Sequence, residues 1–152
     1  MRPTGKFIAI LTLAAVLLVV KSLLPYAKPE GGYSIDKVYK YLKDVDNQRD
    51  VYEKAIELNG GDSANTCVYF VAEVLRRNGI YIDKSTCNTE QLIKILQNKG
   101  WQRISNYEEL QPGDLCFTTD GFGNKKGIPS HTYIFMGWVE EGQFDYAYIC
   151  DN

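Results

Sequence analysis

The stretch SANTCVYFVAEVLRRNG, residues 63–79, has the sequence of one complete amphipathic helix with both of its ends. Ser, Asn and Thr commonly cap helix N-termini, and all three stand just before Cys67. Apolar residues then recur at helical spacing, and Gly79 suits the position that follows a helix C-terminus. We therefore expect a core helix from about Cys67 to Asn78, with the Cys67 thiol near its N-terminal end.

Three further segments show the same helical spacing. They are IDKVYKYLKDV (residues 35–45), which Ser34 is placed to cap, QRDVYEKAIELNGG (residues 48–61), which ends in two glycines, and NTEQLIKILQNKGW (residues 88–101), with Asn88 or Thr89 as its cap and Gly100 at its end. The first half of the domain is therefore predicted to be helical.

After Trp101 the periodicity changes from helical to alternating. ELQPGDLCFTT (residues 109–119) has a Pro-Gly turn before a short apolar strand, HTYIFMGWV (residues 131–139) is rich in β-prone residues, and FDYAYICDN (residues 144–152) alternates after a hairpin turn at EEGQ. Helices followed by an antiparallel meander predict a single α+β domain, for which a chain of 152 residues has room.

The N-terminal segment, residues 1–32, is set apart from this domain. Two basic residues precede the uncharged apolar run FIAILTLAAVLLVV, residues 7–20, which is the pattern of an export signal. The apolar residues after Lys21 can extend this run toward the length of a membrane span. The segment is therefore either a cleaved signal peptide or an uncleaved membrane anchor with a linker. Both interpretations place residues 33–152 outside the cytoplasm.

Charge and cysteine spacing argue against several classes of function. The chain has 17 Lys and Arg and 19 Asp and Glu, of which residues 33–152 hold 13 and 18, and this acidic balance argues against nucleic-acid binding through phosphate contacts. The four cysteines form no C-x-x-C motif, and there is one histidine, so no metal site is expected and no cofactor is predicted. Disulfides are conceivable in an exported domain, but Cys116 and Cys150 should lie on strands that flank a third and are not expected to pair.

Cys67 and His131 are the candidate catalytic pair. A helix N-terminus favours the thiolate, which is the nucleophilic form of cysteine. Cysteine is also common as a small buried core residue, so its position alone leaves both roles open for Cys67. His131 starts a predicted strand just after a glycine-rich loop. As the single histidine, His131 must be the general base of any Cys-based hydrolase in this chain.

A third polar group is expected beside the His131 ring. In a catalytic triad such a group accepts a hydrogen bond from the second ring nitrogen and orients the imidazole. Counted back from the turn near Gly142, Asp151 or Asn152 reaches the level of His131 on the neighbouring antiparallel strand. Polar residues are also common at strand ends without any catalytic role. The sequence does not choose between Asp151 and Asn152.

Taken in order, the segments NTCVYFVAEVLRRNGI, TEQLIKILQNKGW, LQPGDLCF and SHTYIFMGW resemble the NlpC-type and CHAP-type cysteine peptidases and amidases of bacterial cell walls. In that family a cysteine opens a helix, a Pro-Gly-Asp turn leads into a strand, a histidine opens the next strand, and a polar residue follows on the strand after it. The resemblance covers about residues 45–152. It implies a papain-like fold, in which N-terminal helices pack on a small antiparallel sheet.

The resemblance also implies roles for the candidate residues. Cys67 would be the nucleophile and His131 the general base. Asp151 or Asn152 would orient the histidine, since CDN is similar to the Glu-x-Asn ending of CHAP-type domains. The implied substrate is an amide bond in peptidoglycan, either in the stem peptides or at an amide linkage. The bond would be cleaved through a thioester, with the oxyanion held partly by the Cys67 backbone N–H.

The resemblance also gives structural roles to two further residues and leaves several points open. Asp114 and Cys116 would have structural roles in the family pattern, in the turn and in the strand after it. Family members usually add further strands, so the domain is either minimal or continues beyond Asn152. The alternatives for function are a catalytically inactive module that binds wall peptides in the same cleft, and an amidohydrolase that acts on an amide outside peptidoglycan. The oligomeric state is not predicted.

Overall fold

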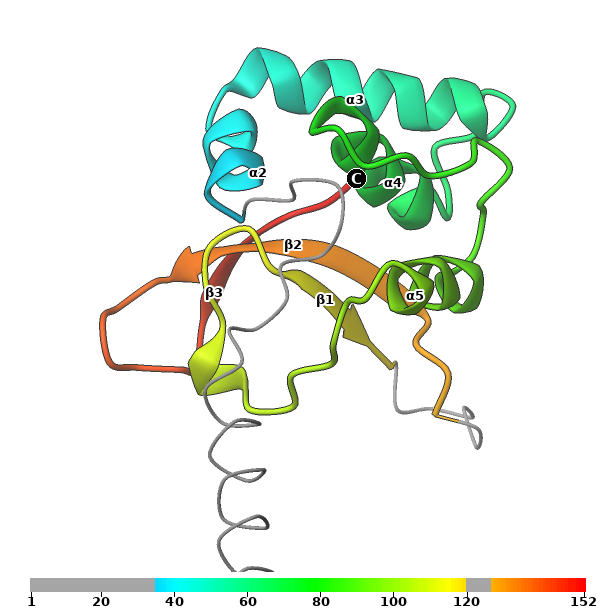
Figure 1. Cartoon of the computed structure of the whole chain (residues 1–152). Helices are drawn as coiled ribbons and strands as arrows, with labels where there is room; N and C mark the ends of the chain where they lie inside the picture. The colour runs from blue at the N-terminus through cyan, green and yellow to red at the C-terminus, as the bar shows by residue number, and fades with distance from the viewer. Residues whose placement is uncertain (1–34, 120–126) are drawn as a thin grey trace, which may run out of the picture.

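The computed structural model describes residues 35–119 and 127–152, and within these ranges helices come first and strands follow (Figure 1). The elements are α2 (Ile35–Leu42), α3 (Val45–Leu58), α4 (Cys67–Arg77), α5 (Thr89–Asn98), the 3-10 helix η1 (Tyr107–Glu109), β1 (Leu115–Thr118), β2 (His131–Trp138) and β3 (Ala147–Cys150). This order confirms the predicted α+β class. The predicted signal or anchor, its linker, Ser34 and most of the glycine-rich loop lie outside the described residues.

No helix in the described ranges is both long enough and apolar enough to cross a membrane.

Three of the predicted element boundaries were wrong: the end of the first helix, the start of the second helix (Val45 instead of Gln48) and the start of the last strand. The first helix ends at Leu42 instead of Val45, because Asp44 caps a new helix by accepting a hydrogen bond from the Asp46 backbone N–H at 2.9 Å. The last strand starts at Ala147 instead of Phe144, whose ring packs against Trp138 at 5.2 Å between ring centres. At each of them a side-chain interaction overrides the periodicity.

Two other helix ends are closed by the residues that the sequence indicated. Asn88 caps α5, since its side chain accepts from the Gln91 backbone N–H at 2.9 Å. Gly79 follows α4 with a φ of 90°, and the next N–H, that of Ile80, returns to the Leu75 carbonyl at 2.9 Å. These contacts confirm Asn88 as the cap of α5 and Gly79 as the residue that follows α4.

The strands form one antiparallel sheet in the order β1-β2-β3, so β2 is central. The register pairs Leu115 with Ile134 and Ile134 with Cys150, and these residues face the helices. A shift in register lies between Phe135 and Gly137. Figure 1 shows α2, α3 and α4 together on one side of the sheet, with α5 near one end of it.

The core is centred on α4, which contacts α3, α5 and β2. Seven consecutive or near-consecutive residues of this helix are buried: Val68, Phe70, Val71, Ala72, Glu73, Val74 and Leu75. On the far side of the sheet, a second group of aromatic rings packs edge to face: Tyr107, Phe135, Trp138 and Phe144. Both faces of the small sheet therefore contribute to packing.

The Pro-Gly-Asp turn is docked onto β2 by backbone hydrogen bonds. Gly113 N–H donates to the Phe135 carbonyl at 2.7 Å, and Phe135 N–H donates to the Asp114 carbonyl at 2.9 Å. Gly113 has a φ of 105°, and a Cβ there would lie 2.4 Å from the Ile35 carbonyl oxygen, so only glycine fits. The Asp114 carboxylate accepts from the Gln111 N–H at 2.8 Å, and burial raises its pKa. Asp114 therefore supports the turn, as expected.

Candidate active site

His131 and Asp151 come together at one end of the sheet. His131 is the first residue of β2, Asp151 follows the last residue of β3, and His131 Nε2 lies 3.1 Å from Asp151 Oδ2. The two side chains are 40% and 32% exposed, so solvent reaches both. The count along the strands had left Asp151 and Asn152 open, and the structure brings Asp151 to the ring. The Asn152 side chain is exposed and bonds to no described residue.

The Asp151 contact determines which ring nitrogen of His131 is available for chemistry. An ionised carboxylate only accepts hydrogen bonds, so His131 Nε2 donates in this pair. A neutral imidazole carries one proton, and its other nitrogen, Nδ1, then has the free lone pair. No hydrogen bond to Nδ1 is formed by the residues that the structure describes. Nδ1 is therefore the ring nitrogen without a hydrogen-bond partner among the described residues.

The start of β2 is held by its neighbours in the sheet. The register pairs His131 with Thr118 of β1, and the Ser130 N–H donates to the Thr118 carbonyl at 2.9 Å. Tyr133 packs its ring beside the His131 ring, with 5.8 Å between the ring centres. The sequence analysis did not single out Tyr133 as a site residue. The signal that could have found it is the spacing of two residues along a strand, which puts both side chains on one face.

Cys67 is the first residue of α4, and its half-buried side chain packs against the core. Thr66 precedes the helix, but its hydroxyl donates to the Ser63 carbonyl at 3.1 Å and caps no helix N–H. Asn65 has a φ of 59°, in the left-handed region that Asn tolerates better than most residues. The tight turn before Cys67 therefore leaves the helix N-terminus without a cap from Thr66.

Cys67 and His131 lie on neighbouring elements, since α4 packs directly on β2. Along β2, the side chains of Ile134 and Met136 pack with the helices. His131 and Tyr133 alternate with them, so their side chains lie on the opposite face of the sheet. Within residues 35–119 and 127–152, no hydrogen bond joins the Cys67 sulfur to the His131 ring. Two of the three predicted groups are thus in contact, and the pairing of Cys67 with His131 stays a prediction.

All four cysteines are free, and they differ in environment. Cys116 and Cys150 lie on the two strands that flank β2, so they are not paired with each other, as expected. Burial raises the pKa of each of these two thiols to about 11, which keeps them protonated at neutral pH. Cys87 is exposed and lies beside the Gln91 side chain. Of the four, Cys67 alone combines partial exposure with a place at a helix N-terminus.

No group of three or more His, Cys, Asp and Glu side chains suited to a metal ion occurs in the described part of the chain.

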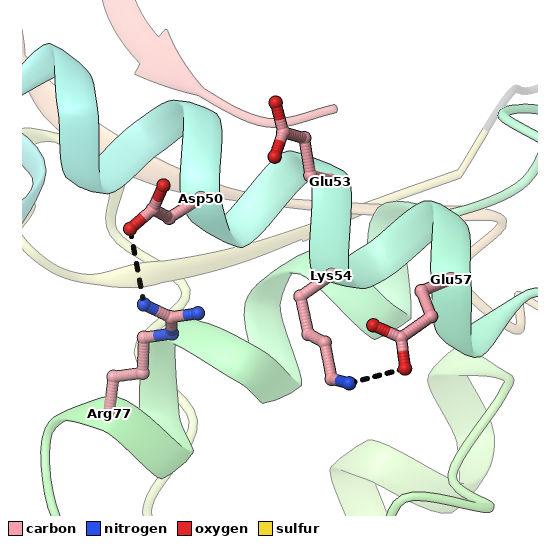
Figure 2. Close-up of a pocket in the computed structure, with 5 residues that line it drawn as sticks. All are labelled: Asp50, Glu53, Lys54, Glu57 and Arg77. Carbon is pink, nitrogen blue, oxygen red and sulfur yellow. Dashed lines mark hydrogen bonds and ion pairs between the residues drawn. The ribbon is translucent and has the colours of Figure 1, made fainter.

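A charged groove lies at the other end of α4, between that helix and α3 (Figure 2). It is lined by Asp50, Glu53, Lys54, Glu57 and Arg77. Arg77 pairs with Asp50 at 3.8 Å, and Lys54 pairs with Glu57 at 2.5 Å. Arg77 ends the helix that Cys67 begins, and eleven helical residues span roughly 15 Å. This groove is therefore separate from the end of α4 that carries Cys67.

A comparison of the chain with protein-family models, with curated proteins and with solved structures finds no match.

Proposed function

We propose that residues 33–152 form a cysteine hydrolase that cleaves amide bonds, with Cys67 as nucleophile, His131 as general base and Asp151 as the residue that orients the histidine. The observation that carries the proposal is the 3.1 Å contact between His131 Nε2 and Asp151 Oδ2. The single histidine of the chain meets a carboxylate from the neighbouring strand, at a half-exposed position, with its other nitrogen left for a substrate or a nucleophile. This is the base and orienting pair that nucleophilic catalysis requires.

The proposed reaction starts from the Cys67 thiol. His131 Nδ1 takes the thiol proton, and the thiolate attacks the carbonyl carbon of the amide. The Cys67 backbone N–H, at the start of α4, helps to hold the oxyanion. His131 then gives its proton to the leaving amine, the C–N bond breaks, and a thioester remains on Cys67. Next, His131 takes a proton from water, the resulting hydroxide attacks the thioester, and a carboxylic acid and the free thiol are released. Overall, an amide and water give an amine and an acid.

The neighbouring groups support this assignment to Cys67. The other thiols are either buried with a raised pKa, as in Cys116 and Cys150, or exposed in the loop before α5 and its cap, as in Cys87. Cys67 begins the helix that packs on the strand of His131. Its sulfur lies at the positive end of the helix dipole, which stabilises a thiolate.

We further propose a papain-like arrangement and a cell-wall substrate. Support for the arrangement comes from the order of the elements, since a helix that starts with cysteine precedes a central strand that starts with histidine. Support for peptidoglycan comes from the likeness of the sequence segments to NlpC-type and CHAP-type enzymes. The apolar N-terminal segment supports a location outside the cytoplasm, either secreted or anchored to the membrane.

Digestion of purified peptidoglycan by the full-length chain tests the proposal. Hydrolysis of an amide bond releases new amino groups without new reducing sugar ends, so both are measured. Cys67→Ser and His131→Ala should each abolish the release of amino groups, and Cys87→Ser is the matched control that should keep it. Thermal unfolding of each variant shows that it is folded.

Each outcome of this digestion has a distinct meaning. Full release of amino groups by Cys67→Ser or His131→Ala would refute the proposed catalytic pair. Binding of peptidoglycan with no product from the wild-type chain would point instead to a module that binds wall peptides. Activity on a simple peptide amide, but not on peptidoglycan, would keep the chemistry and refute the proposed substrate.

A further inference from the structure

Thr89 joins the N-terminal end of α5 to the segment that leads into His131. Its hydroxyl donates a hydrogen bond to the carbonyl of Pro129, two residues before His131 and 40 positions along the chain from Thr89. The Thr89 side chain is largely out of solvent, with the residue only 7% exposed. The hydrogen bond itself is part-buried, and a bond that is shielded from water is electrostatically stronger than an exposed one.

This bond completes a chain of contacts between the two candidate catalytic residues. Cys67 begins α4, and α4 contacts α5. Thr89 is the first residue of α5, and its hydroxyl fixes Pro129. On the other side, the Ser130 N–H is held by the Thr118 carbonyl of β1. The backbone just before His131 is thus fixed both to the sheet and to the helices that carry Cys67.

We infer that Thr89 is a positioning residue of the candidate site, whose buried hydroxyl sets where the His131 ring lies relative to Cys67. The inference rests on the proposed function, because it assigns Thr89 a role through His131. The reason is geometric. Pro129 is two residues from His131, so a shift of the Pro129 carbonyl also moves the start of β2, where His131 lies. A misplacement of about 1 Å between reacting groups lowers rates by up to roughly a hundredfold.

The test measures the rate at which iodoacetamide alkylates Cys67 in the full-length chain. A Cys87→Ser background removes the exposed competing thiol, and the buried Cys116 and Cys150 react slowly. The rate is measured at about pH 6, where an ordinary thiol is almost fully protonated, and again at high pH, where thiols are ionised without help. The ratio between wild type and His131→Ala gives the acceleration that depends on His131.

Three variants are compared in this assay. Thr89→Val removes the hydroxyl at nearly constant shape, Thr89→Ser keeps the hydroxyl, and Thr86→Val changes a second buried threonine, whose hydroxyl bonds to no described residue. We expect Thr89→Val to lower alkylation near pH 6 by about tenfold or more and to leave the high-pH rate unchanged. Thr89→Ser and Thr86→Val should behave like the wild type.

A second background separates positioning from general loosening of the fold. In His131→Ala, the additional change Thr89→Val should have no effect on the alkylation rate, because the group that Thr89 positions is gone. An equal loss of the alkylation rate from Thr89→Val in both backgrounds would overturn the inference. A wild-type alkylation rate near pH 6 in Thr89→Val, or a lowered rate in Thr89→Ser, would overturn it as well. If the wild-type chain itself shows no acceleration that depends on His131, the proposed function fails, and this inference fails with it.

Discussion

At its C-terminal end, α4 is closed by charged side chains that pair with one another, whereas its N-terminal end leaves polar groups without such partners. The Glu73 carboxylate accepts from Arg76 Nε at 2.8 Å and from Arg77 Nε at 2.9 Å. Arg77 also reaches Asp50 of α3. At the other end, the Cys67 sulfur forms no hydrogen bond with any residue that the structure describes. The C-terminal end of α4 is therefore held by ion pairs, whereas the Cys67 sulfur at its N-terminal end is held by none in the described part of the chain.

Under the proposed function, this difference separates the residues that stabilise α4 from the residue that reacts. Glu73 is buried, with 10% of its side chain exposed, and such a carboxylate is tolerated only because two guanidinium groups compensate it. The Cys67 sulfur has no comparable partner among the residues that the structure describes. The buried ion pairs of Glu73 lie within the last turns of α4, away from Cys67, and Arg77 also reaches α3 through Asp50.

The largest expected effect is at the N-terminal end of α4, where Cys67→Ala should lower amide hydrolysis by about a thousandfold or more. The free energy of unfolding should change by no more than about 1 kcal/mol, because the side chain is half-buried and the change to alanine is small. Hydrolysis assays and urea unfolding measure the two quantities. A variant that unfolds but keeps its activity per folded molecule would reverse the comparison between the two ends.

Next in size is the effect at the C-terminal end of α4, where Glu73→Ala should lower the free energy of unfolding by about 3 kcal/mol. This change leaves Arg76 and Arg77 without their buried partner, which is the costly way to break an ion pair. Glu53→Ala is the matched control, since Glu53 is a carboxylate that lines the charged groove between α3 and α4, and this change should cost about 0.5 kcal/mol or less. Activity per folded molecule should not change in either variant. A loss of activity per folded molecule in Glu73→Ala alone would contradict the separation of the stabilising end of α4 from the end that carries Cys67.

A smaller effect is expected for the orienting carboxylate. Asp151→Ala removes the acceptor for His131 Nε2 and should lower hydrolysis by about tenfold to a hundredfold. Asp151→Asn should lose less, since its amide oxygen can still accept from Nε2. Asn152→Ala is the control, because its side chain bonds to no described residue. An Asn152→Ala effect larger than that of Asp151→Ala would mean that the wrong residue has been assigned.

The smallest effect is a pH dependence of stability at Glu73. Burial alone would raise the pKa of Glu73, but the hydrogen bonds and charges of Arg76 and Arg77 outweigh it, and the pKa lies below its usual value. The native state therefore binds this proton less readily than the unfolded chain. Its stabilising contribution is present above the ordinary glutamate pKa, about 4.3, and is lost as the pH falls through the lower, folded pKa. In urea unfolding, the gap between wild type and Glu73→Gln should narrow from neutral to acid pH. If the difference in the free energy of unfolding between wild type and Glu73→Gln stays constant with pH, the ionised Glu73 carboxylate is not its source.

The sequence predicts the His131 and Asp151 contact well. In an antiparallel hairpin, the number of residues from the turn determines which residues of the two strands lie side by side. The turn near Gly142 and the alternation before Asp151 sufficed to bring one of two residues to His131. Choosing between Asp151 and Asn152 required the structure, since the register shift between Phe135 and Gly137 leaves no mark in the pattern.

Contacts between distant elements were beyond sequence reasoning. Glu73 sits in an amphipathic pattern where a charged residue normally faces solvent, and its burial depends on how α3 and α4 meet. Thr89 looks like an ordinary capping residue, and its bond to Pro129 spans 40 positions. Local patterns specify elements and their ends, whereas the pairing of side chains across the fold depends on tertiary packing.

The most direct test of the central claim, that Cys67 and His131 act as a pair, is the nitrogen NMR spectrum of the histidine ring. With one histidine in the chain, the signals need no assignment. We predict a proton on Nε2, and a shift of the Nδ1 signal when Cys67 is changed to alanine, with no shift in the Cys87→Ala control. Identical His131 spectra in the wild-type chain and in Cys67→Ala would contradict the pairing and, with it, the proposed hydrolase.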